Sequence, residues 1–104
     1  MRIYVLAAIA LFPSFALADD YVLTLKDHVF TPAQLSVPKD TKVTITVKNQ
    51  DSTPAEFESH ELKREKIIPG NSEAVITVGP LKAGSYPFFD EFHEDSAKGV
   101  LVVQ

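Results

Sequence analysis

The chain is built from short runs in which apolar and polar residues alternate, and this pattern limits it to an all-β fold. The alternation is clearest in residues 21–25, 43–47 and 74–78. In a strand, successive side chains point to opposite faces, so each run has one face suited to burial. Turn-forming residues such as Gly79 and Pro80 separate the runs. Short strands separated in this way predict a β-sandwich or barrel, here of about seven or eight strands.

The first 18 residues predict a secretory signal peptide. Arg2 precedes an apolar stretch that Pro13 interrupts, and small residues lead up to Ala18. A transmembrane helix needs about 20 apolar residues, so we expect cleavage after Ala18 and a protein that is not embedded in a membrane. The mature chain, residues 19–104, is long enough for one domain. Within it, residues 61–65 are a candidate for a short helical turn.

Composition excludes several classes of function. The chain has no cysteine, so its stability cannot come from disulfides and no metal can be held by a protein thiolate. Without Arg2, nine basic residues face fourteen acidic ones, a formal net charge of −5. Binding to nucleic acid through phosphate contacts is therefore not expected, and a cationic partner fits better.

One loop concentrates side chains that can bind a metal. It lies between predicted strands at residues 84–89 and 99–103, and its candidate ligands are Asp90, Glu91, His93, Glu94 and Asp95. Carboxylates and imidazoles are common metal ligands. The alternative interpretation is an acidic hairpin tip that is simply solvated.

A second group of candidates lies at residues 56–60. If this segment is extended, Glu56, Glu58 and His60 share one face, and Phe57 points to the core. The alternative is the solvated face of a half-buried strand. His60 belongs either to the same metal site or to a second position with Glu61 or Glu65.

The order of these motifs resembles the cupredoxin family. The resemblance rests on the turn Asn49-x-Asp51-x-x-Pro54, the segment at residues 81–88, the following loop and the strand that begins at Gly99. It implies a cupredoxin-like Greek-key β-sandwich. In blue-copper members a cysteine stands where this chain has Asp90, and a histidine stands at the positions of both Glu56 and His93. Without thiolate or a retained methionine, a type 1 copper centre is not expected.

Residues 54–70 more narrowly resemble the cupredoxin-like domain of EfeO-type iron-uptake proteins and of small cupredoxins that accompany ferrous-iron permeases. The match is carried by Glu56-Phe57-Glu58 and by the charged stretch before Ile67-Ile68-Pro69-Gly70. The resemblance implies a periplasmic accessory protein that binds copper, iron or both, with an iron permease or another periplasmic or membrane component as partner.

In the cupredoxin arrangement the loop lies beside residues 56–60. We therefore expect Asp90 and His93 to converge with Glu56 and Glu58, with His60 and Glu94 as further candidates. Carboxylates brought close together repel one another unless a cation neutralises them. A mixed site of this kind points to Cu(II), iron or manganese. His28 is interpreted as a surface or structural histidine.

No catalytic motif is recognisable in the chain, so we do not expect an enzyme acting alone. We predict a metal-binding accessory of iron import, which captures Fe(II) or helps a partner to oxidise it. Two alternatives remain open: a periplasmic protein that buffers copper, and a metal-free β-sandwich that binds other proteins.

Overall fold

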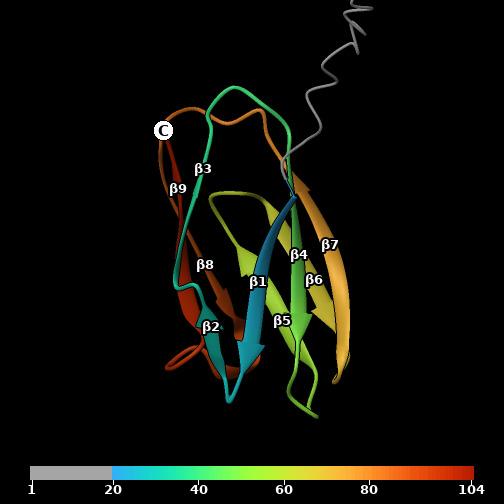
Figure 1. Ribbon diagram of the computed structural model, residues 1–104. Coiled ribbons are helices and arrows are strands. Elements are labelled where there is room, and N and C mark those ends of the chain that lie inside the picture. Colours follow the sequence, from blue (N-terminus) through green and yellow to red (C-terminus); the bar gives the residue numbers. More distant parts are fainter. Residues whose placement is uncertain (1–19) are drawn as a thin grey trace, which may run out of the picture.

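The computed structural model describes residues 20–104 as two β-sheets packed face to face (Figure 1). The strands are β1 (Asp20–Lys26), β2 (Val29–Thr31), β3 (Gln34–Val37), β4 (Val43–Asn49), β5 (Ala55–Ser59), β6 (Arg64–Ile68), β7 (Ser72–Val78), β8 (Gly84–Asp90) and β9 (Lys98–Val103). One 3-10 turn, η1 (Glu91–His93), follows β8. Over these residues no helix has the length and apolar character needed to cross a bilayer. The predicted signal peptide and the start of the mature chain lie outside the described residues.

The strands form one four-stranded and one five-stranded sheet. Their orders are β2-β1-β4-β7 and β3-β9-β8-β5-β6. Both sheets are mixed, because β1 runs parallel to β4 and β3 runs parallel to β9, whereas the other pairs are antiparallel. The predicted all-β sandwich is confirmed, with nine strands in place of the seven or eight expected.

The difference in number comes from two short strands that the alternation pattern does not reveal. β2 has three residues, too few to show a period. β6 lies at the edge of its sheet, and four of its five residues are exposed. The helical turn considered for residues 61–65 is not formed, because residues 64 and 65 already pair with β5. Arg64 then joins the two sheets, since its Nε donates to the carbonyl of Thr77 at 2.9 Å.

The core lies between the sheets and is centred on three phenylalanines. Phe57 and Phe88 stack with their ring centroids 5.3 Å apart, and Phe30 meets Phe88 edge to face at 5.1 Å. All three are almost fully buried. They come from β2, β5 and β8, so these rings join the two sheets directly beneath β5, the strand that carries both Glu56 and Glu58.

Gly99 is required for the close packing of β9 against this cluster. A Cβ atom at this position would lie 2.5 Å from the carbonyl oxygen of Ala33 and 2.6 Å from the ring of Phe88. Real side chains do not tolerate such distances, so the glycine allows the end of the acidic loop to approach the core.

We expect Phe88→Ala to lower the free energy of unfolding by about 3 to 5 kcal/mol, because it removes a fully buried ring and leaves a cavity. Urea unfolding of the mature protein measures this. Val75→Ala on the exposed face of β7 is the control and should change stability by less than about 1 kcal/mol. If Phe88→Ala and Val75→Ala lower the free energy of unfolding by the same amount, this description of the core is contradicted.

Candidate metal centre

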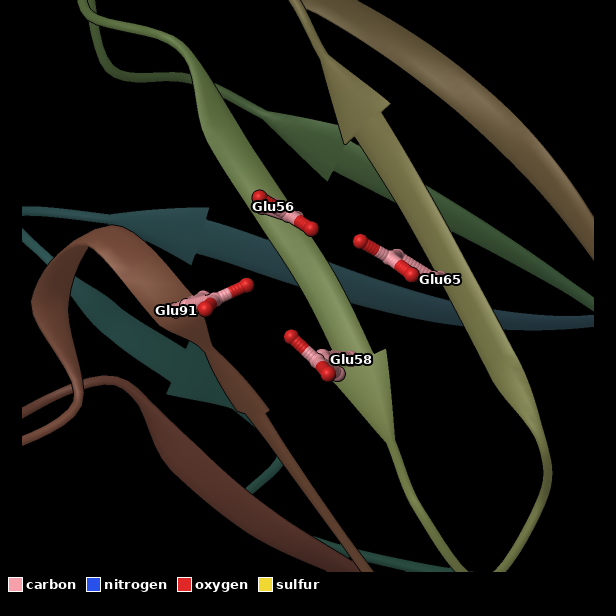
Figure 2. Close-up of side chains that lie close together, drawn as sticks. All are labelled: Glu56, Glu58, Glu65 and Glu91. Atoms are coloured by element: carbon pink, nitrogen blue, oxygen red, sulfur yellow. The ribbon is translucent and has the colours of Figure 1, made fainter.

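Four glutamates converge on the outer face of the five-stranded sheet. They are Glu56 and Glu58 of β5, Glu65 of β6 and Glu91 of η1, and Figure 2 shows their side chains pointing toward one another. Each offers one carboxylate oxygen to a group in which all of these atoms lie within 4.8 Å of one another. We call these four residues the glutamate cluster.

Strand geometry explains how the glutamate cluster forms. Glu56 and Glu58 are two residues apart in β5 and therefore share a face, opposite to that of Phe57. In the antiparallel pairing of β5 and β6, Glu58 lies directly across from Glu65. Glu91 follows β8 on the other side of β5 and approaches the pair from there. Three neighbouring chain segments thus each contribute to one site.

The proximity of the carboxyl groups raises their pKa values. A hydrogen bond shared with Glu65, followed by burial and by the charge of Glu91, raises the pKa of Glu56 to about 7. A hydrogen bond with Glu91, again with burial, raises the pKa of Glu58. Both shifts reflect the cost of holding several negative charges together in a partly desolvated place.

One oxygen of the glutamate cluster has no partner. Glu58 Oε2 is buried and makes no hydrogen bond within the described part of the chain. The other Glu58 oxygen, Oε1, lies 3.9 Å from His60 Nδ1. A buried carboxylate oxygen without a donor is costly, so this atom is suited to a bound cation.

Asp90 lies below the cluster, where it organises the backbone. Its side chain is completely buried. Oδ1 accepts hydrogen bonds from the backbone N–H of Glu56 at 2.9 Å and from that of Phe92 at 3.0 Å. Oδ2 lies 2.9 Å from His93 Nδ1. Both oxygens are therefore occupied within the protein.

The other predicted ligands lie outside the glutamate cluster. His93 faces Asp90 on one side and stacks on His28 on the other, with the ring centroids 3.6 Å apart. His60 is exposed and its ring lies 5.6 Å from that of Phe89. Glu94 is exposed and lines a hollow formed with residues of β8 and β9, including Lys98.

Of the six predicted ligands, the structure therefore brings Glu56 and Glu58 together as expected, but joins them to Glu65 and Glu91. Asp90 and His93 pair with each other instead. The role of each predicted ligand in metal binding stays a prediction. Glu91 is one of the candidate ligands of the acidic loop, whereas Glu65 is a candidate only for a second position with His60. That Glu65 faces Glu58 follows from the pairing register of β5 and β6.

Comparison with known proteins identifies the family. The model of the cupredoxin-like domain family matches residues 1–103. The chain belongs to the cupredoxin-like domain family. It is also 46% identical over 81 residues to an uncharacterized protein of Rickettsia prowazekii (strain Madrid E), a match that covers 78% of this chain and 65% of the length of that relative.

Solved structures with the same fold include proteins that bind copper. One is the metal-binding domain of the Streptococcus pneumoniae D39 Cu(I)-exporting P-type ATPase CopA with Cu(I), at 20% identity and a TM-score of 0.70, covering 82% of this chain and 84% of that one. Amicyanin from Paracoccus versutus shows 19% identity and a TM-score of 0.65, covering 84% and 83%. The purple cupredoxin from Nitrosopumilus maritimus shows 18% identity and a TM-score of 0.64, and the match covers 82% of this chain and 100% of that one. At these identities the likeness establishes the fold.

The donor atoms of this cupredoxin-like domain do not fit a type 1 copper site. The chain has no cysteine, and its single methionine is Met1. Asp90 and Glu56 occupy the places that the cupredoxin resemblance gives to cysteine and histidine, and Asp90 is already saturated by hydrogen bonds. What the domain offers instead is a set of carboxylate oxygens, which prefer harder cations.

The raised pKa of Glu56 predicts that the metal-free protein loses stability as pH rises. Its pKa is 4.5 ordinarily and about 7 in the folded protein. The stability contributed by protonated Glu56 is therefore fully present below the unfolded value and is lost as pH rises through the folded one. We expect thermal unfolding followed by circular dichroism to give a lower Tm at about pH 8 than at about pH 5.

Glu56→Gln, which is neutral at both pH values, should weaken this dependence. Glu61→Gln is the matched control, because Glu61 is exposed and lies outside the glutamate cluster. Glu61→Gln should keep the pH dependence of Tm seen in the parent protein. If Glu56→Gln keeps it as well, the carboxyl groups of the cluster do not repel one another as described.

Proposed function

We propose that this cupredoxin-like domain is a periplasmic metal-binding accessory of bacterial iron uptake, and that the glutamate cluster holds the metal. The observation that carries the proposal is the convergence of four carboxylates within 4.8 Å, one of which has a buried oxygen with no hydrogen-bond partner. A bound cation would satisfy that oxygen and neutralise the repulsion that raises the pKa of Glu56.

The donor chemistry favours a hard ion. An all-carboxylate set suits Fe(III), Fe(II) or Mn(II) better than Cu(I), which prefers sulfur ligands. The cluster also lies on an outer sheet face, so its ligands approach an ion from one side and leave positions for water. Such an open site is suited to an ion that must later be released to another protein.

The role in iron uptake is supported by the resemblance of residues 54–70 to EfeO-type and permease-associated cupredoxins. Three of the four clustered carboxylates, Glu56, Glu58 and Glu65, lie within this segment. In this proposal the predicted signal peptide delivers the protein to the periplasm, where the domain captures iron. A membrane permease then receives the ion as cargo.

Copper is the second candidate, and two observations favour it. Proteins with the same fold include a metal-binding domain of CopA with Cu(I) and a copper-binding protein. In addition, His60 lies beside Glu58 and would supply an imidazole, which suits Cu(II). A Cu(II) ion held by Glu58 and His60 would make the domain a copper-buffering protein.

Calorimetric titration of metal-stripped mature protein tests these alternatives, with Fe(II) under anaerobic conditions and with Mn(II) and Cu(II) in separate runs. We expect one tight site for iron. Glu58→Gln should weaken the affinity at least about tenfold, because it removes a carboxylate from the centre of the cluster and leaves other carboxylates in place.

Glu61→Gln is the control for the loss of one negative charge and should leave the affinity unchanged. A site that prefers Cu(II) and is weakened by His60→Ala would replace the iron assignment with the copper alternative. The absence of binding by every metal would contradict a metal-binding function and would favour a protein-interaction module.

A further inference from the structure

A chain of contacts crosses the sandwich and ends on the glutamate cluster. It begins at Asp51, in the connection between β4 and β5, whose two carboxylate oxygens accept hydrogen bonds from the backbone N–H of Asp27 at 2.6 Å and of His28 at 3.0 Å. Burial acts to raise the pKa of Asp51, but these two N–H groups lower it below its ordinary value, so the acceptor is anionic at neutral pH.

These two hydrogen bonds hold an unusual turn. Asp27 and His28 join β1 to β2, and both have a left-handed backbone, with φ of 51° and 57°. This conformation is uncommon for residues other than glycine. Asp51 compensates for it, because the two successive N–H groups point to the same carboxylate. The side chain of His28 is thereby held in a defined place.

The ring of His28 connects this turn to the other sheet. Its ring stacks on that of His93, with the centroids 3.6 Å apart and the planes 13° from parallel. His28 belongs to the turn of the four-stranded sheet, and His93 belongs to η1 beside the five-stranded sheet. The two rings are therefore a direct contact between the turn and the loop that carries Glu91.

His93 in turn contacts Asp90, and Asp90 bonds to the backbone on both sides of the cluster. Its Oδ1 accepts from the N–H of Glu56 in β5 and from the N–H of Phe92, the residue after Glu91. The backbone segments that carry Glu56 and Glu91 are therefore joined through one buried carboxylate. Any movement of His93 that displaces Asp90 changes the separation of these two ligands.

We propose that His28, held by Asp51, is a positioning residue for the metal centre and sets the geometry of the glutamate cluster through His93 and Asp90. This inference rests on the proposed function. His28 acts on the cluster without belonging to it, because it is not among the four residues whose ligand atoms converge.

The stacked rings do not form a chelating site in this arrangement. The Nδ1 atoms of His28 and His93 face Asp51 and Asp90, at 3.4 Å and 2.9 Å. A nitrogen lone pair of imidazole lies in the plane of its ring, so the lone pairs of two nearly parallel rings do not converge on one ion. The two histidines instead lie outside the glutamate cluster and reach it through Asp90.

The test compares metal affinity in His28→Asn and His28→Phe with that of the parent protein. Asparagine tolerates the left-handed backbone but removes the ring, whereas phenylalanine retains a ring that can stack. We expect His28→Asn to weaken binding about 10- to 100-fold, as changes to outer partners of metal sites do. His28→Phe should restore most of the affinity.

Asp51→Asn provides a second variant and should act in the same direction as His28→Asn, because it replaces one of the two acceptor oxygens used by the turn with an NH2 group, which cannot accept. Thermal unfolding must show that each variant is folded at the titration temperature. If the folded variants His28→Asn and Asp51→Asn bind metal as tightly as the parent protein does, the positioning role is overturned. The proposed metal site itself would then still stand.

Two further measurements separate this inference from the proposed function. In metal-free protein, amide exchange at Glu56 and Phe92 should accelerate in His28→Asn, and exchange at Val102 should not. This result is expected even if no metal binds, and equal exchange in parent and variant would contradict the contact chain. At saturating Cu(II), an electron paramagnetic resonance signal whose nitrogen coupling persists in His60→Ala and is lost in His28→Asn would make His28 a ligand and would overturn the positioning role.

Discussion

The buried carboxylate of Asp90 is the interaction on which the functional end of this domain depends. It stands at the end of β8, in the same core-facing row as Phe88, where an apolar residue would otherwise be expected. A fully buried carboxylate is tolerated only when its oxygens are bonded, and Asp90 meets this condition with two backbone N–H groups and the ring of His93. Those bonds join β5 to the turn after β8, and so the position of the glutamate cluster follows from how Asp90 is satisfied.

The fold holds the four carboxyl groups of the glutamate cluster close together, although their negative charges repel one another. Strand pairing places Glu58 across from Glu65, and the chain after β8 adds Glu91, so negative charges gather where the pKa values of Glu56 and Glu58 are raised. Proteins of the same fold include copper-binding domains. This chain keeps the sandwich but supplies oxygen donors in place of sulfur, which is why the shared fold does not transfer a blue-copper function to it.

Much of the architecture could be predicted because burial on one face of a strand leaves a period of two in the sequence. Strands β1, β4 and β7 follow this rule, and their apolar rows form the core as expected. β6 does not, since an edge strand exposed along most of its length has no buried row to mark it. The same limit applied to the site: Glu65 could not be placed beside Glu58 before the register of β6 was known.

The sequence by itself determined the fold class, the lack of thiolate ligands and the common face of Glu56 and Glu58, because these depend on residue type and on spacing within one strand. Only the tertiary structure decided which residues meet across strands. It paired Asp90 with His93, stacked His93 on His28 and brought Glu65 and Glu91 to Glu56 and Glu58. These contacts depend on register and on the packing of two sheets, and residues far apart in the chain carry no local signal of either.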